Sequence, residues 1–386
     1  MMMISMNAKK NISGRPGVAL LVVLFIVMVI TITTLGFLSQ SDVELACGQN
    51  MVMRTEMDYL AESGLEHARG LILNPQDVSA PEEYWKGDTN LQLTADSDFY
   101  EIKVNRDVSD FCNYIIDCNA YSVEGAERIG LSRLRAELRI DPCIAYWVGT
   151  STTIRPQMNI DGDVYCDGNL TNNGVIGGDA FAAGTIAGAS VGGRKSELVV
   201  QAPIVWPGLE SSDFSPYFIG SAGYLAEVVD VNTQEVESFD STEFNPAGIY
   251  YCEIDVNMPG DVNINGMLVV DGNLWVSGAN NIITSVKNFP ALLVTGQVVM
   301  KDNAELVING LAQIGQGISI DAGAASANID VIGGLFVGLD GITSDLISVN
   351  VTAAPAKASI ETWLSFNTAK RWTPAAGAFF RNITRR

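Results

Sequence analysis

A run of about 21 residues without a charged side chain, residues 18–38, constrains this chain more than any other feature of its sequence. A helix rises about 1.5 Å per residue, so a helix over this run spans about 30 Å, the thickness of the hydrocarbon core of a bilayer. Most of its positions are Val, Ile, Leu or Phe, each of which favours insertion by roughly 0.3 to 0.6 kcal/mol. The run therefore predicts one membrane-spanning helix in contact with membrane lipid.

The charges on either side of the run predict its orientation. Lys9, Lys10 and Arg15 precede it, and the first acidic residue is Asp42. By the positive-inside rule we expect a cytoplasmic amino terminus, a single pass through the inner membrane, and a periplasmic or extracellular remainder. A cleaved secretory signal is the alternative, although its apolar core would be about 7 to 15 residues long. A lipoprotein signal ending at Cys47 is disfavoured, because Glu44 stands where an aliphatic residue is needed.

The helical pattern continues beyond the apolar run. Apolar and small residues recur at spacings of three and four until Asn74-Pro75 ends the pattern. They are Met53, Met57, Leu60, Gly64, Ala68 and Leu71. Residues 18–73 are therefore predicted to form one rod, whose first half lies in lipid and whose second half covers a sheet.

Two stretches, one just before this rod and one within it, resemble a known family. Arg15-Pro16-Gly17 before the apolar run, and residues 60–66 with the sequence LAESGLE, are similar to the amino-terminal region of PilX-type minor pilins of type IV pilus assembly and the related K-type pseudopilins of type II secretion. The similarity covers roughly residues 10 to 75. It implies a filament subunit whose partners are other pilins or pseudopilins and an inner-membrane assembly platform.

The resemblance also implies how the amino terminus is processed. In this superfamily a prepilin peptidase cuts after a glycine, which corresponds to Gly17 and makes residues 1–17 a cytoplasmic leader and Val18 the mature terminus. Major pilins carry Glu at the fifth mature position, where this chain has Val22. Because that carboxylate pairs with a neighbour's terminal amine in the filament, its absence suits a tip or initiating subunit. It also leaves open whether Gly17 is cleaved.

Residues 99–140 show the period of two that is typical of strands. Apolar residues alternate with polar ones around Ile102, Ile116 and Ala136, and Glu124-Gly125 supplies a turn. The predicted unit, residues 74–141, is an antiparallel sheet that packs on the helix, so the fold class is α+β. Asp141-Pro142 marks its boundary, since proline cannot continue a central strand.

The composition and the pattern of the sequence change over residues 142–360. Glycine becomes dense, and a motif recurs in which two apolar residues, any residue, Gly, any residue and an apolar residue follow one another. Its glycines are Gly168, Gly272, Gly296, Gly310 and Gly334. The last four are separated by 24, 14 and 24 residues, which favours a β-helix-like solenoid with coils of about 19 residues. An antiparallel sandwich is the alternative.

Two segments depart from this repeat. Residues 201–248 are rich in proline and acidic residues, and we expect an insertion with a short helix there. Residues 361–386 combine basic and aromatic side chains, and we expect them to cap the last coil; a docking tail for an acidic neighbour is the alternative. These side chains are Lys370, Arg371, Arg381, Arg385, Arg386, Trp363, Phe366, Trp372, Phe379 and Phe380.

The chemistry of the sequence argues against catalysis. The chain has 23 basic and 44 acidic residues, a formal charge of −21, so nucleic acid is not an expected partner. Residues 188–192 match G-x-S-x-G and residues 193–196 imitate a phosphate loop, but the one histidine, His67, lies far upstream on the helix. The six cysteines have no metal-binding spacing, and disulfides are permitted but not required.

Three functions remain, in this order. The first is a minor pilin or pseudopilin-like structural subunit of a type IV pilus or a type II secretion pseudopilus, with no cofactor. The second is a signal-anchored envelope adhesin whose solenoid binds glycans. The third is a polysaccharide-active β-helix enzyme that uses clustered carboxylates, for which Asp161, Asp163 and Asp167 are candidates, with a calcium site there as a further option.

Overall fold

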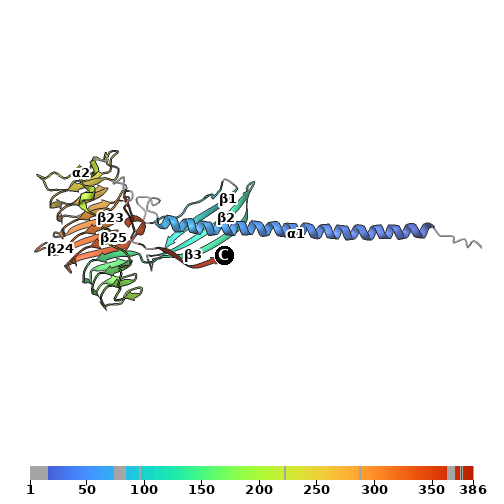
Figure 1. Cartoon of the computed structure of the whole chain (residues 1–386), viewed down its shortest axis with the longest axis horizontal. Helices are drawn as coiled ribbons and strands as arrows, with labels where there is room; N and C mark the ends of the chain where they lie inside the picture. The colour runs from blue at the N-terminus through green and yellow to red at the C-terminus, as the bar shows by residue number, and fades with distance from the viewer. Residues whose placement is uncertain are drawn as a thin grey trace, which may run out of the picture.

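The computed structural model describes residues 16–385 apart from 74–83, 95–96, 109, 111, 221–222, 287–288, 363–369, 374 and 376. It has three parts, a long rod, a small sheet packed along one end of the rod, and a solenoid that lies across that end (Figure 1). Lys9, Lys10 and Arg15 of the predicted leader lie outside the described residues, as do Asn74-Pro75, Trp363, Phe366 and Arg386.

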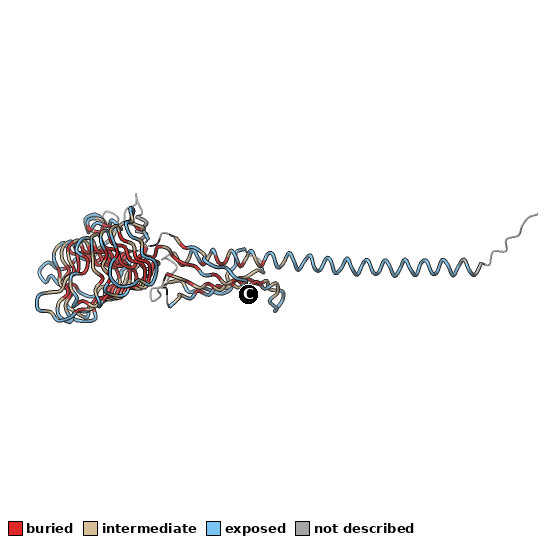
Figure 2. The backbone as a smooth tube through the Cα atoms, turned by 90° about the horizontal axis from the view of Figure 1, so that it is seen from below, coloured by how far each residue is buried: buried red, intermediate tan, exposed pale blue. Residues whose placement is uncertain are grey.

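The rod is helix α1 (Pro16–Leu73), which has 58 residues and is therefore about 87 Å long. Figure 2 shows that its first part is exposed and that burial begins only where the sheet lies. The buried residues are Met57, Ala61, Gly64, Leu65, Ala68 and Ile72. The predicted rod is confirmed, but its buried stripe is centred about one residue later than expected, because Leu60 and Leu71 lie at the margin of the contact.

The sheet is antiparallel and contains β1 (Asp98–Arg106), β2 (Asn113–Glu124), β3 (Glu127–Ile140) and β30 (Ala378–Arg385), in that order. Its first three strands and their inward residues agree with the sequence pattern, since Ile102, Ile116 and Ala136 are buried. Gly64 marks the closest approach of α1, because a Cβ there would lie 2.5 Å from the Cys118 Sγ atom.

The described residues 378–385 of the C-terminal segment lie on the small sheet and do not cap the solenoid as expected. Strand β30 pairs with β3, from Leu134 opposite Arg385 to Ile140 opposite Ala378. Arg385 then donates to Asp58 of α1 at 2.8 Å, so the last strand is bonded to the helix as well as to the sheet. A bulge opposite Glu137 and Leu138 interrupts the strand, so its apolar residues do not alternate regularly in the sequence.

The predicted solenoid is confirmed, and its strands are parallel, which excludes the antiparallel sandwich. The first face contains, in spatial order, β12 (Lys195–Ser196), β10 (Ala180–Ala182), β7 (Asp163–Cys166), β4 (Ile144–Val148), β25 (Ala327–Val337), β23 (Ala304–Ile314), β21 (Leu292–Val294), β18 (Met267–Val270), β15 (Ile249–Cys252) and β13 (Glu227–Val228).

The second face is divided into two sheets. One contains β11 (Ile186–Gly188), β8 (Leu170–Asn172) and β5 (Thr152–Ile154); the other contains β26 (Gly341–Ile342), β24 (Gly317–Ile320), β22 (Val298–Met300), β19 (Leu274–Val276) and β16 (Val256–Met258). The third face contains β9 (Val175–Ile176), β6 (Met158–Asp161), β27 (Ile347–Ala353), the first halves of β25 and β23, β20 (Asn281–Thr284), β17 (Asn263–Asn265) and β14 (Phe239–Asp240).

The chain does not wind through this stack from one end to the other. It enters at β4 in the middle and winds outward to β12; it then resumes at β13, at the opposite end, and winds back to β27. The two blocks meet where β4 pairs with β25 and β6 pairs with β27. The solenoid is therefore inserted between β3 and β30 of the small sheet, and both of its connections leave from its middle.

We call the line along which the two blocks meet the seam. Among the described strands, pairs form across the seam on the first and third faces only. On the second face β5 and β26 belong to different sheets. There the Arg155 side chain crosses the seam, with Nε and Nη2 donating to the carbonyls of Ile342 and Thr343, both at 2.9 Å. A guanidinium group thus provides the hydrogen bonds that a strand pair would otherwise make.

The segment expected as an insertion, residues 201–248, has two roles. Its first part contains the 3-10 helix η2 (Ser211–Phe214) and the short helix α2 (Pro216–Gly220), and Ile204, Phe214 and Ile219 pack on the outer side of the first face. Its second part contributes β13 and β14 to the stack. The residues between β12 and β13 are therefore a return connection that covers the first face.

The connection between β27 and β30 contains the remaining short elements. These are α3 (Pro355–Ala358), β28 (Ile360–Thr362) and β29 (Lys370–Trp372), of which the two strands form an antiparallel pair.

The coils are less regular than the predicted 19 residues. Leu268 pairs with Leu292, Leu292 with Ala312 and Ala312 with Leu335. Three successive coils therefore contain 24, 20 and 23 residues. The repeated motif also occupies two kinds of corner. Gly272 and Gly296 lie between strands of different faces, whereas Gly310 lies within β23 and pairs with Gly333, not with Gly334.

Gly333 is a position where the backbone requires glycine. Its φ is +148°, and a Cβ there would lie 2.1 Å from the carbonyl oxygen of Gly310. We expect Gly333→Ala to lower the free energy of unfolding by about 2 to 4 kcal/mol, because strain and overpacking add. The measurement is urea denaturation of the full chain. Gly125→Ala is the control, since Gly125 has a φ of +66° but open space around it; equal losses in the two variants would contradict the predicted clash.

Candidate functional site: the exposed half of the helix and its junction with the solenoid

The first half of α1 is an uncovered apolar surface. Its large side chains from Val18 to Val52 are exposed, and Phe37 is 74% exposed. Thr31 and Thr34 donate their hydroxyls to the carbonyls of Val27 and Ile30, at 2.8 Å in both cases, so these polar groups need no partner in a hydrocarbon environment. Among the described residues, this is the one helix that is long and apolar enough to cross a membrane.

The predicted processing positions lie at the free end of this surface. Gly17 is the second residue of α1, and the exposed side chains of Val18 and Val22 follow it. The structure thus places the three positions on one helical segment, far from the sheet and the solenoid (Figure 1).

A bare segment of α1 separates the apolar run from the sheet. Residues 39–52, which we call the neck, are exposed throughout. At the helical rise the neck is about 21 Å long. Val43, Leu45 and Met51 on this neck have exposed fractions of 60, 62 and 74%. Large apolar side chains in these numbers on a free helix indicate a surface that other helices or lipid would cover.

At the other end of α1, the sheet is joined to the solenoid by a network of ions. Arg139 of β3 is only 5% exposed. Its guanidinium group pairs with Asp110, which lies between β1 and β2, and lies 3.5 Å from both Asp163 and Asp179 of the solenoid. Arg194 binds Asp179 at 2.6 Å and Asp141 at 3.0 Å. Two guanidinium groups thus join four carboxylates across the junction.

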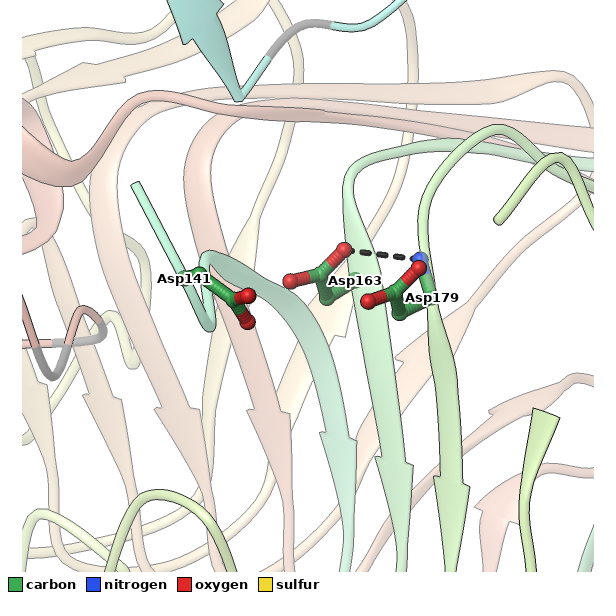
Figure 3. A group of neighbouring side chains, drawn as sticks. All are labelled: Asp141, Asp163 and Asp179. Carbon is green, nitrogen blue, oxygen red and sulfur yellow. Dashed lines mark hydrogen bonds between the residues drawn. The ribbon is translucent and has the colours of Figure 1, made fainter. Parts of the chain in front are cut away.

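The acidic residues of this network also bond to the backbone of successive coils. Asp163 accepts from the N–H groups of Cys143 and Asp179, both at 2.8 Å, as Figure 3 shows for the second of these bonds. Asp179 accepts from the N–H group of Arg194 at 2.7 Å. Each carboxylate therefore caps a backbone donor one coil further along the stack.

The expected carboxylate group is therefore not the one that forms. Asp141, Asp163 and Asp179 have oxygens within 4.8 Å of one another, whereas Asp161 lies beside Asn159 and Asp167 accepts from the Tyr165 hydroxyl. The oxygens that a calcium ion would need at the observed group already accept hydrogen bonds from N–H and guanidinium groups. We read this group as a structural ion-pair network.

Burial makes the carboxyl group of Asp163 an unusually weak acid. Desolvation raises its pKa from the ordinary 3.8 to about 6, against the opposing effects of the Cys143 and Asp179 N–H groups and of Arg139. Between about pH 4 and pH 6, Asp163 therefore holds a proton in the folded chain that it has lost in the unfolded chain. In this window stability falls as pH rises, by up to about 3 kcal/mol from this group.

The test compares urea-denaturation midpoints from pH 4 to pH 7 for the natural chain and for Asp163→Asn. The variant is expected to be less stable overall, because an amide nitrogen replaces one acceptor. Between pH 4 and pH 6, its stability should lack the decrease that Asp163 contributes to the natural chain. Parallel profiles would contradict the raised pKa.

The other sequence motifs have structural roles. Gly188 ends β11 and residues 189–194 form the turn to β12. The Nδ1 atom of His67 lies 2.9 Å from the Tyr100 hydroxyl between α1 and the sheet, so this residue is partly buried and not a free surface residue. All six cysteines are free thiols; Cys47 is exposed and the other five are buried.

Sequence reasoning missed Arg139. The alternation of β3 places it on the polar side of the strand, and that side would be exposed in an isolated sheet. A signal was present in the Asp141-Pro142 boundary two residues later, because a charged residue at a domain boundary can be covered by the next domain.

No protein-family model matches the chain, and no curated protein matches it. Among solved structures, it is similar to the crystal structure of the competence-associated pilin ComZ from Thermus thermophilus, with 10% sequence identity and a TM-score of 0.26. The match covers 86% of this chain and 97% of that one.

Proposed function

We propose that this chain is a minor pilin or pseudopilin-like structural subunit, held in a membrane by the first half of α1 and placed at the tip or starting point of a filament. The role is structural and requires neither catalysis nor a cofactor. The machine is a type IV pilus or a type II secretion pseudopilus.

The observation that carries the proposal is the division of α1 into two halves. The second half is buried against a sheet through Met57, Ala61 and Leu65, while the first half and the neck have no cover. A simple membrane anchor needs about 20 residues and gains nothing from a further 14 bare helical residues before the folded body. A subunit that packs side by side with similar helices uses all of them.

Two features favour the tip. Val22 provides no carboxylate for a neighbour's terminal amine. The solenoid extends to both sides of the α1 axis at the end of the helix opposite its exposed half (Figure 1), where the next subunit of a filament shaft would have to stack. A subunit of this shape fits where nothing is added beyond it.

Partners and location follow from the same surfaces. We propose that the free part of α1 contacts membrane lipid before assembly and other pilins after it, and that an inner-membrane assembly platform and a prepilin peptidase act on its amino-terminal end. The formal charge of −21 disfavours nucleic acid as a ligand.

The test is to produce the full chain together with a major pilin and a prepilin peptidase, and to locate it on sheared filaments by immunogold labelling. We expect label at filament ends and a mature terminus at Val18. Gly17→Leu should abolish processing. Gly36→Leu, in the same helix with open space around its Cα, is the matched control and should be processed normally.

Each result decides a separate part of the proposal. Label along the shaft would contradict the tip position, and absence of the chain from filaments would contradict the subunit role. An intact terminus with normal assembly would contradict only the cleavage at Gly17.

A further inference from the structure

A groove of about 610 Å³ lies on the outer side of the first solenoid face. Its floor contains Trp147, Leu293 and Gln313 from β4, β21 and β23, and its wall contains Trp206 and residues 209–212 of the return connection. The volume falls within the range of about 300 to 1,000 Å³ that is typical of small-ligand sites. The groove lies in the exported part of the chain, away from α1.

Trp206 is held in position before any ligand arrives. Its ring centroid lies 4.8 Å from that of Trp147 and 6.3 Å from that of Phe336, so two aromatic rings support it. The backbone is fixed on both sides of it. The Trp147 Nε1 atom donates to the Ile204 carbonyl at 3.3 Å, and Gln313 bonds to both the N–H and the carbonyl of Leu209. A ligand therefore meets a flat apolar surface that costs little ordering entropy on binding.

Polar groups follow Trp206 directly along the wall. Ser211 is only 8% exposed, and its hydroxyl has no hydrogen-bond partner among the described residues. The carboxylate of Glu210 is exposed and, within the part of the chain that the structure describes, accepts only from the Ser212 hydroxyl, at a long 3.4 Å. The hydroxyl oxygen is not itself fully buried, so it can bond a water or a ligand that enters the groove. Ser211 is thus a polar group that favours a hydrogen-bonding ligand.

We propose that this groove binds a neutral oligosaccharide, with one sugar ring stacked on Trp206 and its hydroxyls bonded to Ser211 and Glu210. A pyranose ring has an apolar face of C–H groups and a rim of hydroxyls, which matches an indole surface beside a hydroxyl and a carboxylate.

The charges at the groove select among ligands. The described residues that line it include Glu210 and no Lys or Arg, and the whole chain carries a formal charge of −21. A polyanionic glycan would be repelled and would find no cation to pair with. A neutral chain avoids this repulsion and uses the carboxylate as an acceptor.

The experiment uses the full chain in phospholipid nanodiscs without glucoside or maltoside detergents, since a sugar headgroup would compete for the groove. Isothermal titration calorimetry with cellohexaose, laminarihexaose and chitohexaose is expected to give a dissociation constant of about 0.1 mM, within a factor of ten, for at least one of them. We expect Trp206→Ala to weaken binding at least about tenfold, and Ser211→Ala and Glu210→Gln about threefold each.

Trp275→Ala is the matched control, because Trp275 lies on β19 of the second face and should not affect binding. Since Ser211→Ala and Glu210→Gln remove only polar atoms, they test the site even where Trp206→Ala disturbs the wall. The proposal is overturned if none of the three hexasaccharides binds, or if the groove variants bind as well as the natural chain. Tighter binding of polygalacturonate or of a proline-rich peptide in the same groove would also overturn it. Each of these results is independent of assembly into filaments.

Discussion

Replacing Arg139 by leucine is expected to lower the free energy of unfolding by about 3 to 5 kcal/mol. The side chain is almost fully buried between the sheet and the solenoid, and it lies within ion-pair distance of Asp110, Asp163 and Asp179. Without it, Asp163 loses the guanidinium group beside it and Asp179 keeps Arg194, so the cost is that of carboxylates left in a poorly hydrated place. The orientation of the solenoid on the sheet should loosen as well.

The measurements are urea denaturation of the full chain followed by tryptophan fluorescence, and the rate of proteolysis near residues 141–143. Arg133→Leu is the control, because Arg133 lies on the same strand and is exposed. Arg139→Lys should recover part of the loss, since it restores a charge without the fork of the guanidinium group. If Arg139→Leu behaves like the control, the network does not hold the junction.

Replacing Ile26 and Val29 together by arginine is expected to prevent stable membrane insertion. Each arginine at the centre of a spanning helix costs roughly 2.5 to 3.5 kcal/mol, so the pair offsets most of what the apolar residues of the run contribute. Both side chains lie in the middle of the exposed half of α1. The measurement is the fraction of the chain that stays with membranes after alkaline carbonate extraction.

The control is the pair Val43→Arg and Met51→Arg on the neck, which lies beyond the uncharged run and should leave extraction unchanged. Release of the chain by both pairs alike would show that the membrane contact extends along the neck. Retention of both would show that the exposed half of α1 is held by protein and not by lipid.

The features that the sequence predicts well are those set by neighbouring residues. The alternation around Ile102, Ile116 and Ala136 follows from the period of two in a strand, and the length of α1 follows from its uncharged run and amphipathic continuation. In each case the buried face is determined within a few residues along the chain. The solenoid is also predicted, because a glycine motif that recurs five times indicates stacked coils, although its copies occupy two kinds of corner.

The features that the sequence does not predict depend on residues far apart. Strand β30 pairs with β3 across about 250 residues, and its own pattern is broken by a bulge. The order of the coils is hidden for a similar reason, because a repeat shows that coils stack but not which coil is next to which. The candidate groove is of this kind, since Trp147, Trp206 and Gln313 come from three separate stretches of the chain.

Because the solenoid is inserted between β3 and β30, a force that pulls it away from the exposed half of α1 is shared by two backbone crossings. One passes through residues 141–143, and the other through the segment that leads back from β27 to the last strand. Strand β30 lies alongside β3, so such a force would have to shear a ladder of hydrogen bonds all at once and could not peel them one by one. A protein that carries load between its solenoid and its long helix would gain resistance to tension from this double tether.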